Sequence, residues 1–138
     1  GAGGRRKNRQ RITMQGREVM QPKELAIAAV QILDKKKADN VRLIDISQIS
    51  TLGDYFVLAT GTSATHVKSL ADELEFQLKE KGVPAGRVEG YRSNSWILLD
   101  YESVIIHVFT PEARAFYDLD RLWQDGVPVA IEEYLDAE

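Results

Sequence analysis

The chain has 138 residues, of which 43% are hydrophobic and 28% are charged, proportions that are typical of a single globular domain. It contains no cysteine, which excludes a disulfide scaffold, a cysteine nucleophile and a thiolate metal site. No apolar run approaches the roughly 18 residues that mark a membrane-spanning helix, so we expect no membrane partner.

Charge is distributed unevenly along the chain. Residues 1–20 carry six basic groups and one acid, a formal charge of +5, whereas the remainder carries a formal charge of −8. Binding to nucleic acid depends on neutralising phosphates, and an acidic body is poorly suited to that. We therefore expect a basic protein partner and no direct, sequence-specific binding of nucleic acid.

The segment 1–20 shows no apolar periodicity and begins Gly-Ala-Gly-Gly without a methionine. We expect it to be a disordered basic leader or a remnant of expression. An organelle transit peptide is the functional alternative, because such leaders are rich in arginine and poor in acids.

From residue 21 onward, helical and strand patterns alternate. The first predicted elements are a helix over 22–37 and strands over 41–46 and 54–60. A second helix follows, from an N-cap at Thr62 or Ser63 to a stop at Gly82, and then strands over 96–100 and 104–109. The last elements are a helical region over 111–123 that breaks near Asp118 and a short helix over 130–135.

The main elements follow the order α-β-β-α-β-β-α, which predicts an α/β fold with helices flanking a mixed β-sheet. The strand over 54–60, the long helix and the strand over 96–100 are consistent with a crossover unit. The strands over 96–100 and 104–109 form a hairpin, in which side chains alternate between two faces. The face that we expect to line the core comprises Ile97, Leu99, Tyr101, Val104, Ile106 and Val108.

The other hairpin face is mostly apolar but includes an acid and a histidine. It comprises Trp96, Leu98, Asp100, Ile105, His107 and Phe109. Either helices cover this face, or it is partly exposed and binds a partner. His107 is a single histidine in the middle of a strand, where packing and hydrogen bonding are commoner than catalysis.

The turn Gly61-Thr62-Ser63 lies between a strand and a helix, where free backbone amides can hold a phosphate. A nucleotidyltransferase also needs acidic ligands for two metal ions on an adjoining strand. Here the next acids, Asp72 and Glu73, fall inside the predicted helix, so we favour a helix cap and expect no cofactor or metal. His66 has no nucleophile placed to use it as a base, which favours a capping or solvent-facing role.

Three blocks of the sequence resemble the signature of the ribosomal silencing factors, the RsfS or Iojap-like family. They cover about residues 22–125, nearly the whole expected fold. The blocks are residues 53–63 with His66 and Val67; Glu89-Gly90 with residues 96–100; and residues 107–109 with Arg114, Tyr117, Leu119, Leu122 and Trp123.

The resemblance implies a fold like that of nucleotidyltransferases without their catalytic acids, and a protein that is not an enzyme. Members of the family bind ribosomal protein fourteen of the large subunit, block joining of the small subunit and repress translation. Organellar relatives act in assembly of the large subunit, so an assembly role stays open, as does a nucleotide-binding transferase that uses the turn 61–63.

The resemblance also suggests how the chain is divided. We assign residues 21–126 to the family domain and residues 127–138 to an acidic C-terminal tail. The expected location is the bacterial cytoplasm, or an organelle if the basic leader is a transit peptide.

We predict that the partner binds the second hairpin face and the segments beside it. The predicted residues are Tyr91, Arg92, Trp96, Leu98, Asp100, His107, Phe109, Tyr117, Leu119, Leu122 and Trp123. Trp96 is expected to be an aromatic anchor and Asp100 to meet a basic group. Because the same surface is partly apolar in the free protein, we also predict a weak homodimer that competes with ribosome binding.

Overall fold

The computed structural model describes residues 13–14, 17–18, 20–90, 94–122 and 124–135. The helices are α2 (Pro22–Lys35), α3 (Ala64–Glu80), α4 (Pro111–Tyr117) and α5 (Leu119–Leu122), and a 3₁₀ turn, η1, spans Glu132–Tyr134. The strands are β1 (Thr13–Met14), β2 (Arg17–Glu18), β3 (Asp39–Asp45), β4 (Tyr55–Thr60), β5 (Arg87–Glu89), β6 (Trp96–Asp100), β7 (Val104–Phe109) and β8 (Val127–Val129). Within these ranges no helix is both long and apolar enough to cross a membrane.

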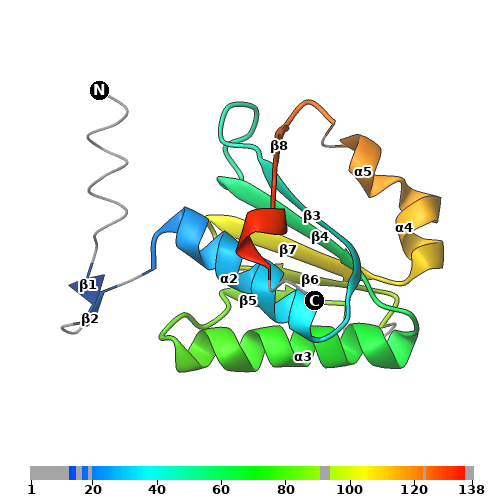
Figure 1. Cartoon of the computed structure of the whole chain (residues 1–138), viewed down its shortest axis with the longest axis horizontal. Coiled ribbons are helices and arrows are strands. Elements are labelled where there is room, and N and C mark those ends of the chain that lie inside the picture. The colour runs from blue at the N-terminus through cyan, green and yellow to red at the C-terminus, as the bar shows by residue number, and fades with distance from the viewer. Residues whose placement is uncertain (1–12, 15–16, 19, 91–93, 123, 136–138) are drawn as a thin grey trace.

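Six strands form one mixed sheet in the order β5-β6-β7-β4-β3-β8 (Figure 1). Only β4 and β7 pair in parallel, and the other neighbours are antiparallel. This mixed sheet with flanking helices confirms the predicted fold class. The predicted crossover to residues 96–100 is wrong, because the hairpin turn returns β7 to the side of β4 and leaves β6 antiparallel to both.

Helices α2 and α3 lie side by side across one face of the sheet (Figure 1). The sequence begins α2 at Pro22, whose fixed φ suits the first turn, and a capping box joins Gln21 and Glu24. Apolar side chains of α2 and α3 and of the facing strands pack into the main core, including Leu33, Leu70, Leu74, Val57 and Ile106, all fully buried. Helix α2 ends two residues earlier than predicted, since Lys37 adopts a left-handed φ of 67°.

The hairpin of β6 and β7 has the bounds and the register that alternation predicts. Ile97 pairs with Val108 on the covered face, and Leu98 pairs with His107 on the opposite face. The predicted break in the last helical region is also confirmed, because Asp118 is left-handed (φ 51°, ψ 48°) between α4 and α5.

Two edge strands were not predicted from the sequence. β5 lies between the predicted helix stop at Gly82 and the strand over 96–100, where no element was predicted, and β8 lies in the segment assigned to an acidic tail. β8 pairs with β3 even though it contains Pro128, which is tolerated because it sits at an edge. Downstream, Ile131 enters the main core and the Gln31 side chain donates a hydrogen bond to the Tyr134 carbonyl at 2.8 Å. Residues 127–135 therefore pack onto the fold, and the helix expected over 130–135 is reduced to the turn η1.

Near the N-terminus, β1 and β2 form a separate two-stranded pair in which Thr13 faces Glu18. This pair lies within the segment assigned to a basic leader. The leader's boundary at residue 20 stays a prediction.

Candidate functional site

The face of the sheet opposite α2 and α3 carries a second, smaller cluster of apolar and aromatic side chains. We define the aromatic face as Phe56, Trp96, Leu98, His107, Phe109, Phe116 and Tyr117, which come from β4, β6, β7 and α4. Helix α4 begins at the edge of this face, where the Thr110 side chain caps it by accepting from the Ala113 amide at 3.2 Å. The aromatic face is therefore assembled by three strands and one short helix.

Exposure rises steadily across the aromatic face. Phe109 is 0% exposed and His107 5%, Trp96 and Leu98 are half-buried, and Tyr117 and Phe116 are 52% and 81% exposed. Neither of the two alternatives for this face holds completely, since α4 covers one end of it and leaves the other open. His107 and Phe109 lie beneath the surface as its floor, while the side chains above them can meet a partner.

Trp96 is held in place by a hydrogen bond to His107. Its indole Nε1 donates to His107 Nδ1 at 3.0 Å. An indole N–H can only donate, so Nδ1 is the acceptor and the neutral imidazole carries its proton on Nε2. His107 is thus packed and hydrogen-bonded, as predicted, although its Nε2 is buried and has no hydrogen-bond partner among the described residues.

Ring contacts extend this arrangement toward the surface. The ring centroids of Phe56 and His107 are 4.5 Å apart, and those of Trp96 and Tyr117 are 4.8 Å apart. Phe116 meets Tyr117 edge to face at 4.9 Å. The result is a continuous path of rings from the floor of the face to its exposed rim, and such rigid aromatic surface is typical of binding hot spots.

A buried arginine anchors the helical side of the aromatic face. Arg114 is 6% exposed and donates from Nε and Nη2 to the two carboxylate oxygens of Asp120, at 2.9 and 2.8 Å. Its Nη1 donates to the Asn40 carbonyl at 2.7 Å and to Thr60 Oγ1 at 2.8 Å. The guanidinium also lies 5.4 Å above the centre of the Phe109 ring. Burial of this charge is tolerated because its donors are matched.

Asp120 receives a second arginine from the sheet. Arg42 Nη1 donates to Asp120 Oδ1 at 2.9 Å, so the carboxylate joins two guanidinium groups. Hydrogen bonding from Arg114 is the largest cause that lowers the pKa of Asp120 to about 2. The carboxylate therefore stays ionised at any physiological pH. We call Asn40, Arg42, Thr60, Arg114 and Asp120 the Arg114 network.

The structure brings together five of the residues predicted for the binding surface, which are Trp96, Leu98, His107, Phe109 and Tyr117. Asp100 is half-buried and already engaged, since its Oδ1 accepts from the Glu102 amide at 2.8 Å and Oδ2 lies 3.6 Å from Arg87 Nη2. Leu119 and Leu122 belong to α5. Tyr91, Arg92 and Trp123 lie outside the described residues.

Sequence reasoning missed Phe116. An apolar residue in a short helix is ordinarily expected to face the core. In α4, however, the core-facing positions are taken by Ala113 and Arg114, which leaves Phe116 exposed beside Tyr117. The sequence offered no local signal for this, because the burial of Arg114 depends on partners that are distant in the chain.

The turn 61–63 caps a helix, as expected. Ser63 Oγ accepts from the His66 amide at 3.2 Å, and the Thr62 amide donates to His66 Nδ1 at 2.9 Å. His66 Nε2 lies 3.0 Å from the Lys36 carbonyl and links the start of α3 to the end of α2. The Thr62 amide is thus committed to His66. The described residues include no group of three potential metal-ligating side chains.

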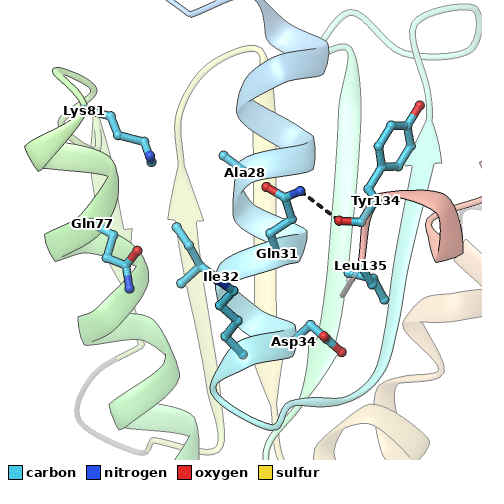
Figure 2. A pocket seen from close by; sticks show the side chains of 9 residues that line it. Ala28, Gln31, Ile32, Asp34, Gln77, Lys81, Tyr134 and Leu135 are labelled. Carbon is cyan, nitrogen blue, oxygen red and sulfur yellow. Dashed lines mark hydrogen bonds between the residues drawn. The ribbon is translucent and has the colours of Figure 1, made fainter. Parts of the chain in front are cut away.

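A hollow lies on the opposite layer, across α2 between α3 and η1, and has a volume of about 220 Å³. Figure 2 shows Gln77 and Lys81 reaching from α3 toward α2, with Tyr134 and Leu135 on the other side. Its floor includes Ala28 and Ile32, which are almost fully buried. Because this hollow exposes little apolar surface and contains none of the predicted residues, the aromatic face is the candidate site.

Comparison with known proteins gives one consistent family. Residues 19–138 match the family described as ribosomal silencing factor during starvation, RsfS. A Halalkalibacterium halodurans protein named ribosomal silencing factor RsfS is 37% identical over 113 residues, which cover 82% of this chain and 97% of that protein. A Mus musculus protein named mitochondrial assembly of ribosomal large subunit protein 1 is 30% identical over 97 residues, 68% of this chain and 42% of that protein.

Solved structures agree with the sequence relatives. A crystal structure from Chromobacterium violaceum superposes with a TM-score of 0.74 at 34% identity, covering 76% of this chain and 88% of that one. A crystal structure from Bacillus halodurans gives a TM-score of 0.65 at 37% identity, covering 77% of this chain and 93% of that one.

The burial of His107 predicts a pH dependence of stability. Burial lowers its pKa from 6.5 to about 4, so the unfolded chain takes up a proton in this window before the folded chain does. Stability should therefore fall as pH drops from about 6.5 toward 4, by about 3 kcal/mol in the free energy of unfolding. Urea unfolding at intervals across this range measures the effect.

The His107→Phe variant should lose this dependence of the free energy of unfolding on pH. The difference in free energy of unfolding between the variant and the unchanged protein should therefore shrink as the pH is lowered. His66→Gln removes the other imidazole of the chain and should keep the dependence. An equal loss of stability with pH in the His107→Phe variant would contradict the prediction.

Proposed function

The chain belongs to the ribosomal silencing factor family, and from this premise we propose that its aromatic face binds ribosomal protein fourteen of the large subunit. Bound there, the chain blocks joining of the small subunit by occupying space, and so represses translation. The observation that carries this proposal is the exposure of Tyr117 and Phe116, 52% and 81%, beside the half-buried Trp96. Neighbouring exposed aromatic side chains of this kind mark a surface for a protein partner.

Charge supports a ribosomal partner. Residues 21–138 carry a formal charge of −8. A protein that contacts ribosomal RNA is expected to be basic, because it must neutralise phosphates. Opposite net charges speed the encounter of two proteins and favour the correct orientation. We therefore expect association to slow as salt is added, while the aromatic contacts determine how long the complex lasts.

The proposed activity requires no chemical step. Steric exclusion depends only on where the chain binds and for how long, so the Gly61-Thr62-Ser63 turn keeps a structural role as the cap of α3. This argues against the alternative of a nucleotide-binding transferase at that turn. We further propose a bacterial cytoplasmic location, because the Halalkalibacterium halodurans relative, 37% identical over 82% of this chain, is a bacterial protein.

A role in assembly of the large subunit is the second candidate. It is favoured by the name of the Mus musculus relative, which refers to assembly of the mitochondrial large subunit. The two roles predict different defects. Loss of a silencing factor leaves mature subunits that join too readily, whereas loss of an assembly factor leaves immature large subunits.

Subunit joining tests the proposed function. Purified large and small subunits are mixed with excess chain and separated on a sucrose gradient. We expect the two subunit peaks to stay apart, and Tyr117→Ala to require roughly 30 times more protein for the same block, which corresponds to about 2 kcal/mol at a hot spot. Unchanged joining in the presence of the unaltered chain would contradict the proposal.

Phe76→Ala is the matched control for this experiment. It removes another exposed aromatic side chain, 61% exposed, from α3 on the opposite layer. This variant should block joining as well as the unaltered chain does. If Tyr117→Ala and Phe76→Ala have the same effect, the aromatic face is not the surface that binds the subunit.

We also propose that the free chain forms a weak homodimer through the aromatic face. Exposed apolar surface tends to associate with itself, most often as a two-fold dimer, and here the dimer would compete with ribosome binding. Sedimentation equilibrium should show a reversible dimer that Tyr117→Ala weakens. A chain that stays monomeric at high concentration would exclude it.

A further inference from the structure

We propose that Arg114 and Asp120 are positioning residues for docking, because they fix the end of α4 and α5 against the sheet and thereby hold Tyr117 and Phe116 in their binding orientation. This inference rests on the function proposed above. It assigns a role to two side chains that lie behind the contact surface.

The helical rim of the aromatic face cannot hold its own shape. Helix α4 has 7 residues and α5 has 4, and the left-handed Asp118 separates them. Helices shorter than about 12 residues are marginal in water, so tertiary contacts must determine the orientation of this segment.

Apolar packing supplies little of that orientation. The buried side chains of α4 are Ala113 and Arg114, while Phe116 is largely exposed and Tyr117 is half exposed, with its ring against that of Trp96. A short alanine side chain buries little area. The anchoring of α4 therefore depends chiefly on the hydrogen bonds of Arg114.

The Arg114 network joins the rim to the ends of two strands of the sheet. Arg114 reaches the Asn40 carbonyl in β3 and Thr60 Oγ1 in β4, while Asp120 in α5 holds both Arg114 and Arg42. Two nitrogens of the Arg114 guanidinium donate to the two oxygens of the Asp120 carboxylate. This bidentate geometry fixes the relative orientation of the two groups as well as the distance between them. Four elements are thus connected through one buried guanidinium.

The orientation of Tyr117 and Phe116 depends on how α4 and α5 are held. Tyr117 lies one turn after Arg114, and its ring is 4.8 Å from that of Trp96. If Asp120 no longer holds α5, Tyr117 and Phe116 remain in the chain but sample more orientations. A partner must then order them on binding, which lowers affinity without removing any contact group.

The experiment compares two substitutions of the same type two residues apart. Asp120→Asn keeps the size of the side chain and removes the charge that pairs with Arg114. Asp118→Asn is the matched control: Asp118 is exposed, lies 3.8 Å from the exposed Arg121, and has a left-handed backbone that asparagine tolerates. Affinity for purified large ribosomal subunits is measured for both, with a thermal melt to verify folding.

We expect Asp120→Asn to weaken binding about tenfold and Asp118→Asn to leave it nearly unchanged. The double variant Asp120→Asn with Tyr117→Ala should bind less weakly than the sum of the two single effects predicts, because part of the effect of Asp120 is exerted through Tyr117. The NMR signal of the Trp96 indole N–H should shift in Asp120→Asn but not in Asp118→Asn, since the Tyr117 ring that packs beside it has moved. A merely destabilising substitution would not produce this pattern.

The outcomes separate the two proposals. If Tyr117→Ala weakens binding but Asp120→Asn does not, or if their effects simply add, the positioning role is overturned while the docking surface stands. If Tyr117→Ala retains full affinity, the aromatic face is not the docking surface and both proposals fail.

Discussion

A single buried guanidinium determines how the candidate site is built. Arg114 is 6% exposed, and a charge so deeply buried is tolerable only when its hydrogen bonds are made. They are made to the ends of two strands and to α5, so the same bonds that stabilise the charge also locate α4. Because α4 carries few apolar anchors of its own, the open rim of the aromatic face depends on this one residue.

The two faces of the sheet are packed differently. On one face, α2 and α3 bury a large apolar core, and this core does not include the rings of the aromatic face. On the other face, the short helix α4 covers Phe109 and leaves Tyr117 half exposed. A chain with a well-packed core on one side can tolerate apolar exposure on the other, provided that a partner covers it in use.

The sequence pattern predicted the elements whose structure depends on residues close together in the chain. The hairpin of β6 and β7 alternates without interruption, so both bounds and register followed from the sequence. β5 and β8 have three residues each, too few for a periodic signal, and form only because a longer strand offers them an edge. The burial of Arg114 was equally out of reach, because its partners Asn40 and Thr60 are 74 and 54 residues away in the chain.

Site-specific photo-crosslinking tests most directly whether the aromatic face meets the large subunit. A photoreactive phenylalanine analogue replaces Phe116 in one protein and Phe76 in another, the two being exposed on opposite layers of the fold. With purified large subunits, the probe at Phe116 should crosslink to ribosomal protein fourteen, and the probe at Phe76 should not. Crosslinking to that protein from Phe76 but not from Phe116 would contradict the account.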